Sequence, residues 1–455
     1  MRLDGAPLKL ALEMARPSSE RSIAAVIADV GENAALAFVE ELERLGRAGL
    51  FRTQQLDLAD SHERAIRAYM AHHPRKMMLL VSQSCNLRCV YCYAIDGNFP
   101  DEGKLMSLGT AQDAIRFLAK RSGNRTNLTV TLFGGEPLVN FRIIRELVPW
   151  AREWVASIGK RIHFCITTNG TLLTEAAVEF LIRERFSIML SLDGPEAIQD
   201  RFRPTASGRG SFALAAAGIR RLLARHPGRD GIIVRATMSH QSHDVRQLSE
   251  FFEQFGFRRI GLGSTLGFAY GKGPFDLTQQ DREEIDDAIE SLIDERIADG
   301  VRSYTPVPYN PLLRGVLALQ RECNRPGPRV KMACGVGRND QGVDVDGRIY
   351  PCHRYVGMNE YVLGDIWSGI DDDAARRYYD RLAGVYERCR RCWATRWCAG
   401  ACPRYVSAPD GTVMEPDESH CRGVRRSLER TLAWHAQFEE EGLDWDRLER
   451  EASTS

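Results

Sequence analysis

Cysteine is the residue type in this chain that is best suited to metal chemistry. The chain has 455 residues and 12 cysteines, and in a reducing compartment clustered cysteines usually bind metals or act in catalysis. Ten of the 12 fall into two groups, and the first group is the CxxxCxxC segment made of Cys85, Cys89 and Cys92. Three thiolates on one loop can hold three irons of a [4Fe–4S] cube and leave the fourth iron open. The first group therefore predicts an iron–sulfur site.

A zinc site and a chance spacing are the alternatives for this loop. A structural zinc site normally takes four ligands, often from paired CxxC elements, whereas this loop supplies three cysteines. The aromatic Tyr91 stands directly before the last cysteine, and the loop follows a strand-like apolar run at residues 77–81. These neighbours favour the iron–sulfur interpretation.

The second group of cysteines occupies the C-terminal part of the chain. Its members are Cys334, Cys352, Cys389, Cys392, Cys398, Cys402 and Cys421. Seven cysteines are one short of two complete four-cysteine sites, and a short, turn-rich segment usually needs a metal to hold it together. Structural zinc is the alternative for the CxxC element that begins at Cys389. Cys165 and Cys323 stand outside both groups, and Cys165 is expected to be a buried structural thiol.

An alternation of strands and helices must position the first cysteine group. Strand-like runs are expected at 77–81, 128–133, 162–167, 187–192, 231–237 and 258–263. Amphipathic helices are expected near 107–121, 141–157, 174–185, 211–225, 243–255 and 279–298. Because parallel neighbours need helical crossovers, these repeats predict a parallel sheet of the α/β class. Six repeats are too few for a closed eight-stranded barrel, so we expect an open, partial (β/α)6 barrel with reactive groups at the carboxyl ends of its strands.

Residues 76–265 resemble the core of radical S-adenosylmethionine (SAM) enzymes, whose signature is CxxxCxφC with an aromatic φ. The resemblance implies that the three cysteines hold a SAM-binding [4Fe–4S] cluster. The residues that it places in contact with SAM are Tyr91, Gly134, Gly135, Glu136, Pro137, Asn169, Ser191, Asp193 and Arg203. In that family the Gly-Gly-Glu-Pro motif receives the SAM amine, and an arginine that Arg203 resembles meets the SAM carboxylate. Taken singly these residues could be turn residues or a surface arginine, and their order at successive strand ends favours a SAM site.

The resemblance also implies a reaction. In that family the open iron chelates the amino and carboxylate groups of SAM. Electron transfer from the reduced cluster then cleaves the C5′–S bond and yields a 5′-deoxyadenosyl radical, which abstracts hydrogen. An electron donor such as flavodoxin or ferredoxin is therefore an expected partner.

The second cysteine group resembles the SPASM extension, which carries two auxiliary [4Fe–4S] clusters in peptide-modifying radical SAM enzymes. Its ligand scheme implies that Cys334, Cys352 and Cys402 hold the first auxiliary cluster. The second would be held by Cys389, Cys392, Cys398 and Cys421. The chain would then hold three [4Fe–4S] clusters. Some relatives add a fourth ligand to the first auxiliary cluster, so either Cys323 completes it here or one iron stays open, and we favour the open iron.

Two short segments narrow the expected substrate. Residues 350–357 read Tyr-Pro-Cys-His-Arg-Tyr-Val-Gly and residues 392–395 read Cys-Trp-Ala-Thr. Both resemble thioether-forming maturases, namely those of six-cysteine peptides and of the quinohemoprotein amine dehydrogenase small subunit. Anaerobic sulfatase maturases carry an Asp that serves as the base directly after the cysteine of a GxxxxC element. In this chain that element runs from Gly347 to Cys352, and His353 takes the position of the Asp. His353 is a candidate catalytic base or a hydrogen-bond donor beside the cluster.

The resemblance predicts a maturase that installs a cross-link, preferably a cysteine thioether, in a precursor peptide or small protein made by the ribosome. A carbon–carbon cross-link is the first alternative. A maturase that oxidises cysteine or serine to formylglycine is the second, and His353 disfavours it. A non-catalytic iron–sulfur scaffold that binds a peptide is a rival of another class, and the three core cysteines together with Gly-Gly-Glu-Pro argue against it.

Four segments are expected along the chain. Residues 1–70 should form a helical module, 71–310 the partial barrel, 311–430 the SPASM domain and 431–455 a helical tail. Residues 20–55 are similar to the helical half of the winged-helix module with which related maturases grip a leader peptide by strand addition. Three alternatives stay open: the module is a degenerate leader-binding unit, a separate protein holds the leader, or the segment is an ordinary helical cap on the barrel.

Composition excludes some classes of partner. Lys plus Arg and Asp plus Glu both number 61, so charge gives no reason to expect nucleic acid or an anionic membrane. No apolar run approaches the ~20 residues that span a bilayer. Asp4, Lys9 and Glu13 interrupt the first apolar stretches, which argues against a signal peptide and favours the cytoplasm.

Overall fold

The computed structural model covers the whole chain and gives a description for part of it. The described residues are 72–92, 94, 103–226, 231–264, 275–292, 295, 339–389, 392, 394, 398, 402–407, 412 and 418–448, together with a few single residues between 28 and 40. The leader-binding module expected within residues 1–70 lies almost wholly outside this set. Cys323 and Cys334 lie outside it too.

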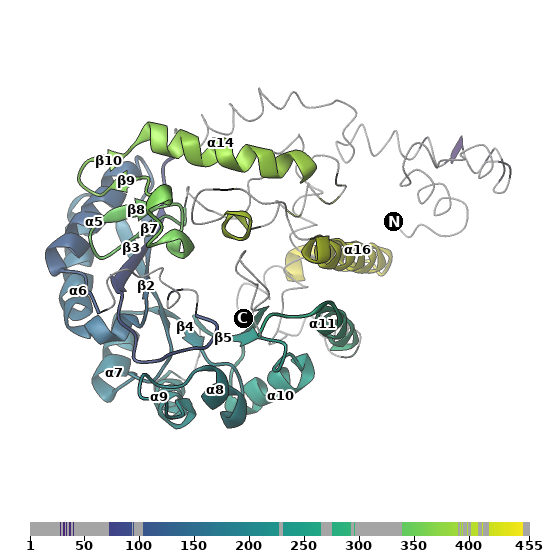
Figure 1. Cartoon of the computed structure of the whole chain (residues 1–455), viewed down its shortest axis with the longest axis horizontal. Coiled ribbons are helices and arrows are strands. Elements are labelled where there is room, and N and C mark those ends of the chain that lie inside the picture. Colours follow the sequence, from purple (N-terminus) through teal and green to yellow (C-terminus); the bar gives the residue numbers. More distant parts are fainter. Residues whose placement is uncertain are drawn as a thin grey trace.

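Six parallel strands form the core of the molecule. They are β1 (Lys76–Ser82), β2 (Asn127–Gly134), β3 (Arg161–Thr168), β4 (Ser187–Ser191), β5 (Ile232–Met238) and β6 (Ile260–Ser264), and each pairs in parallel with the next. The sheet curves, and its helices lie along the convex side (Figure 1). The open, partial barrel predicted from the βα repeats is therefore confirmed.

Helices follow the strands of the core in the predicted alternation. They are α5 (Leu108–Arg121), α6 (Phe141–Ser157), α7 (Glu175–Arg183), α8 (Glu196–Phe202), α9 (Phe212–Arg225), α10 (Val245–Phe255) and α11 (Gln279–Leu292). Side chains of Ser107, Thr174 and Asp244 cap the first turns of α5, α7 and α10 by accepting hydrogen bonds from backbone N–H groups. The short helix α8 was not predicted, because seven residues give too little periodicity to recognise.

Alternation along each strand separates the two faces of the sheet. On β2, Leu128, Val130 and Leu132 are buried, while Thr129 and Thr131 between them are partly exposed. The buried side chains belong to the apolar core, which also includes residues of the surrounding helices. The alternate positions of β2, which include Thr129 and Thr131, form a more polar and more exposed face.

Four short strands extend the sheet beyond β1. They are β7 (Gly342–Val343), β8 (Arg348–Tyr350), β9 (Gly364–Asp365) and β10 (Gly369–Ile370). Strand β7 pairs in parallel with β1, where Met78 faces Gly342, and β8 to β10 continue antiparallel. Core and C-terminal region thus share one ten-stranded sheet (Figure 1). Strands of two or three residues carry no readable alternation, so the sequence did not predict them.

Two long helices complete the C-terminal region. They are α14 (Asp372–Cys389) and α16 (Glu418–Glu440), and α16 runs across residue 430, where a domain boundary was expected. Short 3-10 turns η4 (His353–Tyr355), η5 (Asn359–Tyr361) and η6 (Pro403–Val406) lie between the strands and helices. Among the described residues, every helix is too short or too polar to cross a membrane.

Candidate active site

The loop that carries the first cysteine group is fixed by backbone hydrogen bonds to the end of α8 and the segment after it. Arg88 N donates to Pro204 O at 2.7 Å, and Val90 N donates to Phe202 O at 3.0 Å. The Ala206 N–H donates in the opposite direction, to Asn86 O at 2.9 Å. The protein backbone therefore holds the loop in place at the carboxyl end of β1.

Gly134 and Gly135 allow the end of β2 to lie directly against the chain that enters this loop. Gly134 has φ +132°, and a Cβ atom there would come within 2.0 Å of the Ser82 carbonyl oxygen. A Cβ atom at Gly135 would come within 2.5 Å of the Ser84 carbonyl oxygen. The Gly135 N–H and Glu136 N–H donate to these same oxygens at 2.8 and 2.9 Å. Only glycine fits such an approach.

Glu136 links the end of β2 to the end of β3. Its buried carboxylate accepts hydrogen bonds from Leu138 N at 3.1 Å, Thr168 Oγ1 at 2.8 Å and Asn169 N at 2.7 Å. Burial outweighs these hydrogen bonds and raises its pKa to about 7. Glu136 was expected to contact SAM; in this structure it also organises two strand ends. The next residue, Pro137, is buried at the start of the 3-10 helix η2 (Pro137–Asn140).

Asn169 connects the end of β3 to the cysteine loop. Its Nδ2 donates to Asn86 Oδ1 at 3.0 Å, and its Oδ1 accepts from Thr171 Oγ1 at 2.6 Å. Asn86 Nδ2 donates in turn to Thr171 Oγ1 at 2.7 Å. Asn86 and Thr171 were not predicted as site residues. The position of Asn86 between the first two cysteines was the available signal.

Asp193 gathers three groups beside the cysteine loop. Tyr91 donates its hydroxyl hydrogen to the Asp193 carboxylate, which also pairs with Arg203 Nε at 2.9 Å and accepts from Thr237 N at 3.0 Å. The Arg203 guanidinium carbon lies 5.5 Å from the centre of the Tyr91 ring. The structure therefore brings three of the predicted SAM residues together. Ser191 lies partly buried at the end of β4.

In the absence of iron, the thiols of Cys85 and Cys89 in the cysteine loop are protonated near neutral pH. Burial raises the pKa of Cys85 to about 11 and that of Cys89 to about 12. The positive charge of Arg203 opposes this effect at Cys89. Iron binding must therefore displace protons. Three thiols on one ordered loop, with a buried cation beside Cys89, fit an anionic iron–sulfur cluster.

Cys352 and Cys402 both lie near Tyr355 in the C-terminal region. Burial, followed by smaller electrostatic contributions from both cysteines, raises the pKa of the Tyr355 hydroxyl. Arg404 Nε donates to Arg354 O at 3.2 Å and so ties the turn after Cys402 to the turn after Cys352. Two cysteines that are 50 positions apart in the sequence thus lie in the same part of the C-terminal region.

The other described cysteines of the second group lie on α14, on α16 and between these helices. Cys389 is the last residue of α14, and Cys392 N donates to Cys389 O at 3.1 Å. The side chain of Arg425, one turn after Cys421 on α16, forms a hydrogen bond with Cys392. Cys398 N donates to Ala394 O at 2.8 Å.

His353 lies in the contact between the C-terminal region and the core. Its ring centre is 4.6 Å from that of Phe133, the residue directly before Gly134. Burial, followed by the charges of Arg354 and Arg235, lowers its pKa to about 3. The imidazole is therefore neutral near pH 7.

Cys165 differs from its expectation. It is half-buried on β3 rather than fully buried, and its thiol forms hydrogen bonds with Thr131 and Ser187. Burial still raises its pKa. The thiol is therefore held by polar neighbours on the strands at either side.

Comparison with known proteins decides the class of this site. The sequence profile of the Radical SAM superfamily matches residues 79–244. Residues 79–244 therefore form a radical SAM domain. The matched segment contains all three loop cysteines and every residue of the Asp193 group. The cofactors of such a domain are a [4Fe–4S] cluster and SAM.

Similarity to known proteins covers most of this chain. The cysteine-type anaerobic sulfatase-maturating enzyme of Clostridium novyi is 24% identical over 368 residues, which cover 77% of this chain and 93% of that protein. The structure of anSMEcpe with bound SAM and the Cp18Cys peptide superposes with a TM-score of 0.65 at 19% identity, over 80% of this chain and 99% of that one. The structure of Streptococcus suis SuiB bound to precursor peptide SuiA superposes with a TM-score of 0.53 at 17% identity, over 92% of this chain and 93% of that one.

Proposed function

We propose that this radical SAM enzyme is a maturase that forms a cysteine thioether in a ribosomally made peptide or small protein. The substrate class rests on the similarity to a sulfatase-maturating enzyme and on the likeness to two structures that hold peptides. With both cofactors bound, reductive cleavage of SAM supplies a 5′-deoxyadenosyl radical that removes hydrogen from the substrate.

The residues around the cysteine loop prepare the site for these cofactors. The backbone hydrogen bonds of Arg88 and Val90 hold the thiols in place before iron arrives. Arg203 offsets negative charge beside Cys89, and Asp193 keeps its guanidinium oriented. Glu136 ties two strand ends together and, because a carboxylate can accept about four hydrogen bonds and three are used, keeps an acceptor for the SAM amine.

The observation that carries the choice of product is the environment of His353. An Asp at this position serves as the base in the sulfatase maturases that the sequence resembles. His353 instead packs its partly buried, neutral ring against Phe133. A ring whose pKa lies far below neutrality takes up a proton poorly. Its environment therefore supports a cross-link over formylglycine.

The C-terminal cysteines are proposed to hold two auxiliary clusters. The contacts of Cys352 and Cys402 around Tyr355 support placing these two with Cys334 on the first cluster. The hydrogen bond from Arg425 to Cys392 supports placing Cys389, Cys392 and Cys398 with Cys421 on the second. An auxiliary cluster supplies an electron acceptor and, where one iron lacks a protein ligand, a place for a substrate thiolate.

Mass spectrometry and thiol alkylation of a cysteine-containing precursor peptide can test this proposal. The precursor would come from an open reading frame that neighbours this gene, incubated without oxygen with reconstituted enzyme, SAM and dithionite. Thioether formation predicts 5′-deoxyadenosine and a peptide that loses two hydrogens and one alkylatable thiol per bond. The same peptide with its cysteines changed to serine is the control and should stay unmodified.

Other products would overturn the thioether assignment in distinguishable ways. Loss of two hydrogens with every thiol still alkylatable would mean a carbon–carbon bond. An aldehyde that reacts with a hydrazide would mean formylglycine. Absence of 5′-deoxyadenosine under all conditions would mean a scaffold.

A further inference from the structure

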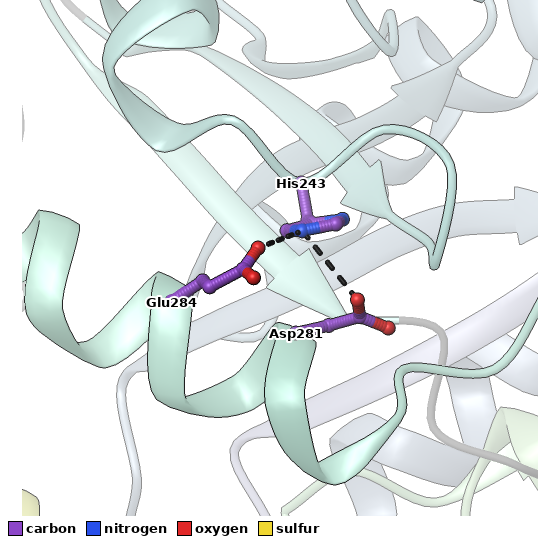
Figure 2. Close-up of side chains that lie close together, drawn as sticks. All are labelled: His243, Asp281 and Glu284. Atoms are coloured by element: carbon purple, nitrogen blue, oxygen red, sulfur yellow. Dashed lines mark hydrogen bonds and ion pairs between the residues drawn. The ribbon is translucent and has the colours of Figure 1, made fainter.

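Three potential metal ligands meet at the carboxyl end of β5, outside both cysteine groups. His243 comes from the loop between β5 and α10, and Asp281 and Glu284 come from the first turns of α11 (Figure 2). One ligand atom from each residue lies within 4.8 Å of the other two. The proposed function uses none of the three.

The spacing of these atoms suits a coordination shell. His243 Nε2 lies 3.0 Å from Glu284 Oε2 and 3.5 Å from Asp281 Oδ1. Ligands that stand ~2.1 Å from a tetrahedral zinc ion are ~3.4 Å apart. Small side-chain adjustments would therefore admit an ion among them.

Hydrogen bonds orient these groups as metal ligands are usually oriented. His243 Nδ1 lies 3.2 Å from Ser239 O, so its N–H donates there and Nε2 faces the two carboxylates. A metal-binding histidine almost always donates its second ring N–H in this way. Asp281 Oδ2 lies 2.8 Å from His240 Nδ1 and accepts from Thr278 N at 2.7 Å, which leaves Oδ1 toward His243.

Charge favours a divalent ion over a proton in this cluster. Asp281 is buried, and the two carboxylates bring two negative charges. With His240 neutral, a protonated His243 would offset one of the two negative charges, whereas a divalent cation beside a neutral His243 would offset both. A buried, uncompensated carboxylate is costly.

We propose that His243, Asp281 and Glu284 bind a divalent transition metal of the zinc class, with His240 orienting Asp281 from behind. One imidazole and two carboxylates suit zinc, and water would complete the shell. The ion would tie the loop after β5 to α11. Because Arg426 of α16 pairs with Asp287 of α11 at 2.5 Å, it would also steady the contact with the helix that carries Cys421. The role is structural.

Zinc analysis of the reconstituted holoenzyme tests this site without reference to activity. After zinc is added anaerobically and the excess is removed, elemental analysis should find about one zinc per chain. X-ray absorption should show only nitrogen and oxygen neighbours, at ~2.0–2.2 Å. His243→Ala and Glu284→Gln should lose this zinc. Glu283→Gln, which removes the same charge from the neighbouring residue of α11, should keep it.

Further variants protect this test from a folding artefact. Asp281 also accepts a hydrogen bond from Thr278 N, directly before α11, so Asp281 is not substituted. The Glu284 side chain is 53% exposed, and Glu284→Gln keeps its shape. His240→Ala should weaken zinc binding ~10–100-fold. Zinc should raise the melting temperature of the wild type and of Glu283→Gln, and leave that of Glu284→Gln unchanged.

Two results would overturn the proposal. Zinc with sulfur neighbours at ~2.3 Å, retained in His243→Ala, would mean occupation of cysteine sites. A holoenzyme that takes up no zinc beyond its cysteine sites would mean that His243 and the carboxylates form an ion pair only.

Discussion

The core strands β1 to β6 and the C-terminal region from β7 to α16 are built by different physical means. The core strands contain five to eight residues, and their buried faces pack against long helices. The C-terminal strands contain two or three residues each. The core can therefore rest on apolar burial, whereas the C-terminal region needs other support.

Part of that support is a set of buried tyrosines. They are Tyr350, Tyr355, Tyr361, Tyr378 and Tyr379. The Tyr355 and Tyr378 rings meet edge to face with centres 5.7 Å apart, which is a favoured aromatic geometry. The C-terminal region thus has more of a core than its weak apolar periodicity suggested, and the clusters proposed for its cysteines would add to its stability.

The other part is attachment to the core. Strand β7 pairs with β1, and His353 packs on Phe133. At the surface, Lys104 pairs with Asp346 at 2.5 Å. These contacts imply that the C-terminal region depends on the core, whereas the core, which rests on its own apolar burial, should stay folded when a cluster of the C-terminal region is lost. The predictions below test that division, from the largest effect to the smallest.

Removing the first cysteine group should abolish chemistry and spare the fold. The triple change Cys85→Ala, Cys89→Ala and Cys92→Ala should cost about four of the ~12 irons expected for three clusters. SAM cleavage to 5′-deoxyadenosine should disappear, while circular dichroism stays that of the wild type, because backbone hydrogen bonds hold the loop. Cys165→Ala is the matched control and should keep iron and cleavage. Iron loss with cleavage intact would refute the assignment of the SAM cluster.

Changing a single cysteine of the second group should separate product formation from SAM cleavage. Cys334→Ala should lose the cross-linked product yet still cleave SAM, because the core is intact. Cys323→Ala is the control, and with an open iron in the first auxiliary cluster it should keep ~12 irons and most of the product. Simultaneous loss of iron and product in Cys323→Ala would mean a fully ligated cluster and favour a carbon–carbon bond.

Glu136→Gln should weaken both SAM binding and the core. The amide can no longer accept from Leu138, Thr168 and Asn169 together, and a buried N–H left without an acceptor costs about 1–3 kcal/mol. Calorimetric titration with SAM and urea unfolding measure the two effects. Glu196→Gln, on an exposed face, should change neither. Unchanged SAM affinity in a destabilised variant would leave Glu136 a structural role only.

The pH dependence of unfolding gives an independent check on Glu136. The folded-state pKa of about 7 lies above the ordinary value of 4.5, so the folded state keeps this proton after the unfolded state has lost it. Stability of the cluster-free, SAM-free protein should therefore fall as pH rises from 4.5 to about 7. In Glu136→Gln that slope should be reduced. An identical slope would show that other groups cause it.

Breaking the surface pair between the regions should have the smallest effect. Lys104 and Asp346 are 44% and 30% exposed, so Lys104→Met should cost less than about 1 kcal/mol in urea unfolding. Arg142→Met, which breaks an exposed pair within α6, is the control. A clearly larger loss for Lys104→Met would mean that this contact, and not the β1–β7 pairing, holds the regions together.

Local patterns in the sequence were sufficient for the core. Apolar alternation located all six strands to within two residues, because each strand buries one face within its own few residues. The CxxxCxxC spacing and Gly-Gly-Glu-Pro predicted the candidate site, because cysteines spaced along one loop and a close backbone approach are local features. They needed no knowledge of distant residues.

Tertiary structure alone decided the rest. Tyr91 and Asp193 are 102 positions apart, and Asn86 and Thr171 are 85 apart. His243 and Asp281 belong to different elements, and β7 is too short to show a pattern before it pairs with β1. These contacts depend on which strand ends and helices come together when the sheet curves. That is a property of the packed chain, because no single segment contains both partners.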